Sequence, residues 1–113
     1  MKIVNLDGYT TNPGDLSWDW LGNYGEYKVY DRTAPEQIVE RAKGADILII
    51  NKSVITAQML ENLPNLKFVG LQSTGYNVID CKAARARNIT VSNIPAYSTT
   101  GVAQLVFAFI LQV

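Results

Sequence analysis

The chain has 113 residues, with 10 basic and 10 acidic side chains, no histidine and a formal net charge of zero. This length supports one domain with a packed core, but not two. The balanced charge argues against nucleic acid and an anionic membrane as partners. The single cysteine, Cys81, cannot form an internal disulfide, and because no signal peptide is visible we expect a cytoplasmic protein.

The first half of the chain predicts strands that alternate with helices. The strands are expected at 2–6, 27–30 and 46–50. A short helix capped by Asp15 is expected to end near Gly22, and a capping box over Thr33–Glu36 opens a helix that ends at Lys43. After Asp46, the strand expected at 46–50 is a continuous apolar run, which is typical of a central parallel strand buried on both faces.

The second half continues the alternation. Strands are expected at 67–71 and 89–92, and helices at 56–63, 80–87 and from Ser98 or Thr99 onward. The order predicts an α/β fold, a flavodoxin-like doubly wound parallel sheet of about five strands with helices on both faces. Ligands on such sheets bind at the carboxyl ends of the strands, so the loops after strands one, three, four and five are the candidates.

Three of these loops carry candidate binding residues. Thr74 and Gly75 lie where a strand turns into a helix, an arrangement that leaves backbone N–H groups free for a carboxylate or phosphate. Lys52 follows the central strand, and Tyr97 and Ser98 precede the last helix. Taken singly, each residue has a simple structural explanation. Lys52 could be a solvated lysine, Tyr97 could cover the core edge, Ser98 could cap a helix, and Gly75 could be needed for a positive φ. Their convergence at neighbouring strand ends indicates a binding site.

Several kinds of chemistry lack their residues. No Gly-x-Gly occurs anywhere, so no dinucleotide fingerprint follows any strand. No pair of Cys or His supports a metal site. Cys81 has no histidine to activate it and is expected to be a small buried residue of its helix.

The last segment, Gly101–Val113, is apolar on almost every side. Such a helix would be buried all round, and 13 residues are too few for a bilayer, which needs about 20. We therefore expect a truncated end, and self-association of the isolated chain through residues 101–113.

Four stretches carry a resemblance to a known family: 45–52, 66–70, 73–80 and 91–104. In order and spacing, the chain resembles the N-terminal part of D-isomer-specific 2-hydroxyacid dehydrogenases, especially the glycerate dehydrogenase or hydroxypyruvate reductase branch. The resemblance implies a substrate-domain core at 1–100 and the start of an interdomain helix at 101–113, with the NAD-binding domain absent from this chain.

The resemblance also implies a function. The parent protein would be a homodimer that uses NAD or NADP to interconvert a 2-keto acid and a D-2-hydroxy acid. The substrate-binding residues would be Lys52, Thr74, Gly75, Tyr97 and Ser98, with the Thr74–Gly75 backbone N–H groups on the carboxylate. No catalytic residue can be carried over, so the fragment is expected to be inactive alone and to bind no cofactor.

A different class of function stays open. A free-standing flavodoxin-like domain would bind its ligand after the first strand, where Thr10, Thr11 and Asn12 lie. A phospho-receiver domain lacks its nucleophile, because Asn51 stands where the third strand should end in an aspartate. A pure interaction module has the apolar tail as its only support.

Overall fold

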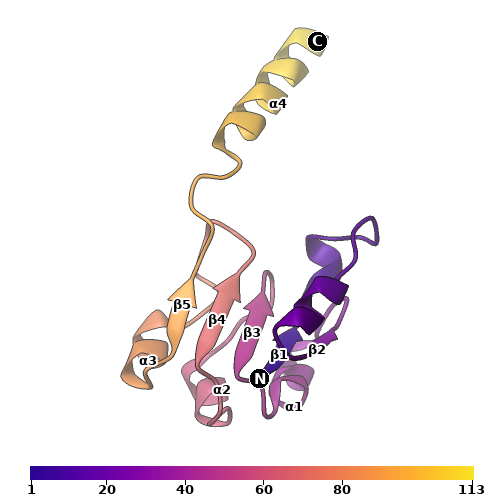
Figure 1. Cartoon of the computed structure of the whole chain (residues 1–113). Coiled ribbons are helices and arrows are strands. Elements are labelled where there is room, and N and C mark those ends of the chain that lie inside the picture. The colour runs from indigo at the N-terminus through magenta and orange to yellow at the C-terminus, as the bar shows by residue number, and fades with distance from the viewer.

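The computed structural model describes residues 1–113 and contains one five-stranded, all-parallel sheet (Figure 1). The strands lie in the order β2-β1-β3-β4-β5. Their bounds are Lys2–Asn5 for β1, Glu26–Val29 for β2, Ile47–Ile50 for β3, Phe68–Leu71 for β4 and Thr90–Ser92 for β5. This sheet and its helices confirm the predicted α/β fold class.

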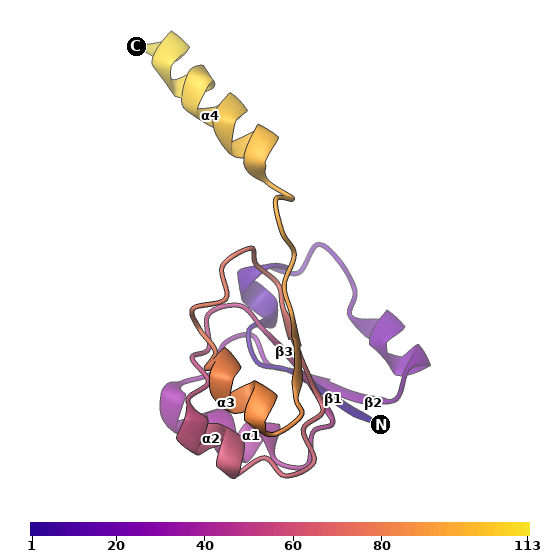
Figure 2. The same cartoon turned by 90° about the vertical axis from the view of Figure 1, so that its left-hand side faces the viewer.

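The two faces of the sheet carry different helices. The α-helices α1 (Ile38–Ala42), α2 (Ala57–Glu61) and α3 (Cys81–Ala86) pack on one face, as Figure 2 shows. Each connects strands that step in the same direction across the sheet, and right-handed crossovers then place all three on the same side. The step from β1 to β2 runs the other way, which puts the 3₁₀ helices η1 (Gly8–Thr10) and η2 (Asp19–Asn23) on the second face.

The core lies between the sheet and α1–α3. Val4, Leu48 and Val69 stand side by side in register on three neighbouring strands and are fully buried. They pack with apolar residues of all three α-helices in one cluster of 16 buried residues. On the second face, Ile49 and Phe68 of β3 and β4 remain only half-buried. The helices on this face, η1 and η2, belong to the connection between β1 and β2, and no helix of the second face follows β3 or β4.

Two of the predicted helix starts are confirmed by their caps. The Thr56 hydroxyl accepts a hydrogen bond from the Met59 N–H, and the Asp80 carboxylate accepts one from the Ala83 N–H. Both bonds satisfy a donor that the first turn of a helix would otherwise leave unpaired.

The capping box predicted at Thr33–Glu36 was wrong. No side chain caps this helix start, and the segment divides into a 3₁₀ turn, η3 (Pro35–Gln37), followed by α1. The Thr33 hydroxyl donates instead to the Leu6 carbonyl at 2.8 Å, across the end of β1. Likewise, the helix expected to begin at Asp15 is η2, which begins four residues later.

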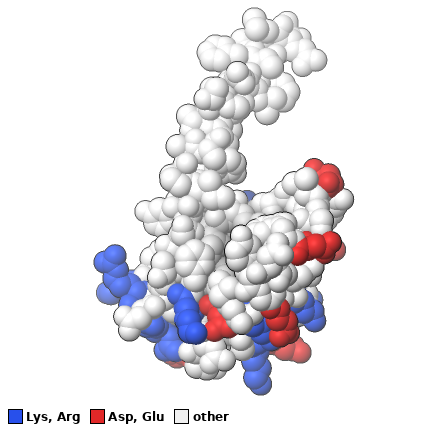
Figure 3. All heavy atoms as spheres, viewed as in Figure 1, with Lys and Arg blue, Asp and Glu red and all other residues white.

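The last helix, α4 (Thr99–Gln112), stands away from the sheet domain (Figures 1 and 2). All of its residues are exposed, and the apolar Leu111 is 85% exposed. It carries no charged side chain, whereas Lys, Arg, Asp and Glu gather on the sheet domain (Figure 3). No helix in the chain combines the length and the apolar character that crossing a membrane requires.

The Asp46 carboxylate links the amino-terminal ends of three strands, and we expect it to make stability depend on pH. It accepts the Lys2 N–H at 2.9 Å and pairs with Lys67 Nζ at 3.1 Å, and these bonds, the Lys2 bond most, hold its pKa below 3.8. A folded-state pKa below the unfolded value stabilises the fold above the unfolded pKa, and that stability is lost as the pH falls through the folded pKa. Urea unfolding of Asp46→Asn should therefore show a deficit at neutral pH that shrinks in acid. The control is Asp31→Asn, an exposed residue, and a deficit for Asp46→Asn that does not change with pH would contradict the expectation.

Candidate functional site

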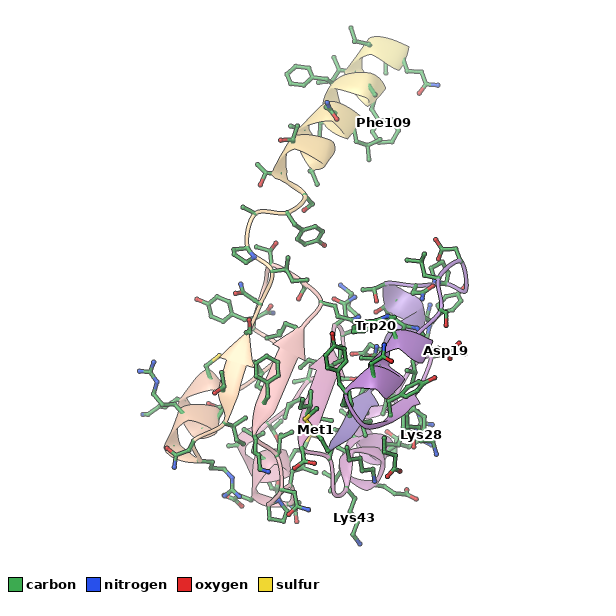
Figure 4. The ribbon with its side chains drawn as sticks, in the orientation of Figure 1. Met1, Asp19, Trp20, Lys28, Lys43 and Phe109 are labelled. Atoms are coloured by element: carbon green, nitrogen blue, oxygen red, sulfur yellow. The ribbon has the colours of Figure 1, made fainter.

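A cavity of about 820 Å³ opens at the carboxyl ends of the strands. The loops that follow β1, β3, β4 and β5 all contribute to it, and Met1 and Lys43 mark the opposite end of the molecule (Figure 4). Its lining combines polar, aromatic and two aliphatic residues: Thr10, Thr11, Asn12, Leu16, Ser17, Trp18, Trp20, Asn51, Lys52, Gln72, Ser73, Ile94 and Tyr97. Lys52 is the one charged side chain among them, so the cavity favours a small anion.

The loop after β4, which lines this cavity through Gln72 and Ser73, contains unpaired backbone donors. None of the backbone N–H groups from Ser73 to Val78 donates a hydrogen bond to another protein atom. The loop is nevertheless held, because the Thr74 hydroxyl donates to the Ile94 carbonyl at 3.0 Å and Asn93 Nδ2 donates to the Thr74 carbonyl at 2.8 Å. A fixed loop with free N–H groups is a suitable binding site for a carboxylate.

The backbone conformation at Gly75 does not require a glycine, because its φ is not positive. The glycines at positive φ are Gly14, Gly25 and Gly44, so the explanation that Gly75 needs a positive φ was wrong. A Cβ atom at Gly75 would meet only the Asn77 side-chain oxygen, at 3.4 Å. The space next to this residue is therefore open, as a ligand that approaches the backbone would require.

The structure brings most of the predicted site residues to one edge of the sheet. Lys52 and Tyr97 line the same cavity, both exposed, from the loops after β3 and β5. Thr74 and Gly75 directly follow Ser73, which also lines it. Ser98 lies outside the lining, and its side chain makes no capping bond to α4, contrary to the simple explanation for it. The role of all five in substrate binding stays a prediction.

An aromatic wall closes one side of the cavity. The Trp18 and Trp20 rings lie 6.4 Å apart by their centroids, and both line the cavity. Their segment is tied to β2 by a 2.7 Å hydrogen bond from the Tyr27 hydroxyl to Asp19. This bond lowers the pKa of the Asp19 carboxyl and raises that of the Tyr27 phenol. The lowered pKa keeps Asp19 ionised at neutral pH, so it accepts the Tyr27 bond as a carboxylate.

The residue that sequence reasoning missed is Asp7, two residues after the end of β1. It is 3% exposed, and its Oδ2 accepts the backbone N–H groups of Asn51, Lys52 and Ser53 at 2.8, 2.9 and 2.8 Å. The Ser53 hydroxyl donates to Oδ1 at 2.9 Å, and Asn51 Nδ2 donates to the Thr10 hydroxyl at 2.8 Å. An acid that immediately follows an apolar strand was the available signal.

Cys81 was wrongly predicted to be buried. It is exposed at the first position of α3, where Ala84 is the residue that faces the core. Cys81 lines a second cavity of about 840 Å³ beside α3 and the edge strand β5, together with Lys82 and Arg85. No residue of the Lys52 loop contributes to it.

Comparison with known proteins identifies the family. Residues 10–108 match the model of the D-isomer specific 2-hydroxyacid dehydrogenase catalytic domain. The chain belongs to this family. Among 2-hydroxyacid dehydrogenases, it is 46% identical to a hydroxypyruvate reductase from Blautia hydrogenotrophica over 100% of the chain but only 36% of that enzyme. It is also 49% identical, over 65% of the chain, to a glycerate dehydrogenase from Methylorubrum extorquens, of which it covers 24%.

Solved structures of dehydrogenases and reductases superpose on this chain. An acyclic imino acid reductase in complex with NADPH and D-Arg superposes with a TM-score of 0.80 at 34% identity over 96% of this chain and 35% of the other. A D-lactate dehydrogenase from Aquifex aeolicus, complexed with NAD and lactic acid, gives 0.78 at 24% identity over 98% of this chain and 33% of the other, which shows the shared fold. The chain spans about a third of the length of these proteins.

The residues of this chain do not fit a dinucleotide. No Gly-x-Gly occurs in it, so none of the five strands leads into the glycine-rich turn that cradles a pyrophosphate. In this 2-hydroxyacid dehydrogenase domain, the strand ends offer unpaired backbone N–H groups and the Lys52 ammonium group.

Proposed function

We propose that the chain is the substrate domain of an NAD(P)-dependent oxidoreductase that interconverts a short 2-keto acid and a D-2-hydroxy acid, of the hydroxypyruvate and D-glycerate type. The observation that carries the proposal is the loop of unpaired N–H groups from Ser73 to Val78 beside the cavity that Lys52 lines. The similarity to hydroxypyruvate reductase and glycerate dehydrogenase supports it.

The proposed substrate binds at the carboxyl edge of the sheet. Its carboxylate accepts N–H groups of Thr74 and Gly75, and Lys52 supplies the positive charge, because hydrogen bonds to an ionised group are the stronger ones. Tyr97 lines the cavity from the loop after β5, and Ser98 follows it in the chain. No aspartate or glutamate lines the cavity, so nothing there repels an anion.

The chain supplies binding and orientation rather than the reaction itself. Reduction of a keto acid needs a hydride, which NAD(P)H carries, and a proton donor with a pKa near neutral. The chain contains no histidine, the side chain that most often serves in this role. We therefore expect the 113 residues to be inactive alone and both the cofactor site and the proton donor to lie outside them.

A domain exchange tests the proposed function. The chain aligns along its whole length with the Blautia hydroxypyruvate reductase at 46% identity, so it can replace the matching part of that enzyme. The chimera should oxidise NADH when hydroxypyruvate is added, and the 113-residue chain should not. A chimera that is folded and binds NADH, but reduces none of hydroxypyruvate, glyoxylate and pyruvate, would overturn the proposal. A flavin spectrum in the purified chain would instead favour the free-standing ligand-binding domain.

A further inference from the structure

The buried carboxylate of Asp7 has hydrogen bonds but no cation as its partner. The single ion pair of the chain joins Lys67 and Asp46, at the other end of the sheet. Burying a charge is costly unless its hydrogen-bonding capacity is filled, and Asp7 fills it with three backbone N–H groups and one hydroxyl. The carboxylate and the segment that surrounds it therefore depend on each other.

The shape of that segment follows from the bonds. Successive N–H groups point in different directions along an extended chain, so three of them meet at one oxygen only where the backbone curls. The curl comes directly after β3, over Asn51–Ser53, and Lys52 is its middle residue. Lys52 is also the charged residue that lines the cavity.

A second set of bonds ties the same turn to the loop after β1. The Thr10 hydroxyl donates to the Asp7 carbonyl at 2.7 Å and accepts a bond from Asn51 Nδ2. Asp7 thus joins the two neighbouring strands β1 and β3 where both end at the cavity.

We infer that Asp7 is a positioning residue for the substrate: its carboxylate fixes the Asn51–Ser53 turn and thereby places Lys52 at the cavity. The inference rests on the proposed function, since it assigns Lys52 to the substrate anion. Asp7 itself touches no substrate. Its contribution is made entirely through Lys52, and this dependence can be measured.

The kinetic test is a double-mutant cycle in the chimera. Asp7→Asn should raise the KM for hydroxypyruvate about tenfold, the effect of losing one charge-assisted hydrogen bond, with kcat and the KM for NADH nearly unchanged. In a Lys52→Met background the same change should raise KM less than about twofold, because the residue it positions is gone. Asp31→Asn, an exposed aspartate at the same edge, is the control and should change nothing. An unaltered KM for Asp7→Asn, or an increase that persists in full without Lys52, overturns the inference.

Amide hydrogen exchange in the 113-residue chain tests the Asn51–Ser53 turn without an activity measurement. The N–H groups of Asn51, Lys52 and Ser53 should be protected, and Asp7→Asn should speed their exchange about tenfold relative to Asp31→Asn. Unchanged protection overturns the inference even if the chimera is active. A chimera without activity that still shows the exchange effect marks the proposed function as the part that failed.

Ser53→Ala keeps the test decisive if Asp7→Asn does not fold. It removes only the hydroxyl bond to Asp7 Oδ1 and leaves the three N–H groups in place. We expect a KM about threefold higher and faster exchange at Lys52, as suits the loss of one weaker bond. No change in either measurement would overturn the inference.

Discussion

Substitution of Gly75 by valine is expected to raise the KM for the keto acid by about 10- to 100-fold in the chimera, with a smaller effect on kcat. Loss of one hydrogen bond to a charged group costs about 1.5–3 kcal/mol, which corresponds to this range. The Cβ atom of the new side chain would meet only the Asn77 side-chain oxygen, at 3.4 Å, so we expect the fold to persist. The branched methyl groups would instead occupy the space that a carboxylate needs beside the unpaired N–H groups.

Gly22→Val is the matched control for this substitution. A Cβ atom there also meets its nearest neighbour at 3.4 Å, in the Tyr27 ring, and Gly22 does not line the cavity. Steady-state kinetics with hydroxypyruvate should separate the two variants, while their thermal midpoints stay similar. Equal KM values for the two variants would show that the loop after β4 does not hold the carboxylate.

Removal of residues 99–113 is expected to convert a self-associating chain into a monomer. The helix α4 exposes large apolar side chains on all sides: Val102, Leu105, Val106, Phe107, Phe109, Ile110 and Leu111 are each more than half exposed. Figure 4 shows Phe109 on α4, clear of the sheet domain. Burial of one such side chain is worth about 1.5–3 kcal/mol, so a few of them covered in a neighbouring copy would favour association at micromolar concentration.

Sedimentation measures this directly. The chain of 113 residues should sediment as concentration-dependent oligomers and the chain of 98 as a monomer. No α4 residue belongs to the buried core, so the shorter chain should keep the circular dichroism of the sheet domain. Val102→Lys with Phe109→Lys controls for the deletion, since it retains the helix but interrupts its apolar surface. A monomeric 113-residue chain at tens of micromolar would contradict the expectation.

The sheet could be predicted because each of its strands is indicated by a local sequence pattern. The apolar run before Asn51 and the alternation with helices indicated a parallel sheet. Because ligands bind at the carboxyl ends of such strands, the loops that carry Lys52, Thr74 and Tyr97 were the candidates for the site. Caps that depend on one nearby donor, as at Thr56 and Asp80, were equally accessible.

Other features depended on partners far away in sequence. Thr33 has the residue type and spacing of a cap, but its hydroxyl donates to the Leu6 carbonyl at the end of β1 and accepts from Arg41 Nη1 instead. Asp7 is bonded to residues 44 to 46 positions later, and no local pattern encodes that pairing. The sequence indicated that Gly75 is a turn glycine with a positive φ. The structure shows that its φ is not positive and that the space beside it is open.

The strand order has a consequence for how the domain is made. After β2 pairs with β1, every later strand adds to the same growing edge, first β3 beside β1, then β4, then β5. Because the ribosome releases the chain from its N-terminus, each of these strands emerges after the neighbour with which it pairs. This sequential growth limits the loop-closure entropy that usually slows parallel sheets. Arrested nascent chains that expose residues up to Ile50, Leu71 and Ser92 should accordingly resist proteolysis in stepwise fashion, and α4 would emerge only after all five strands.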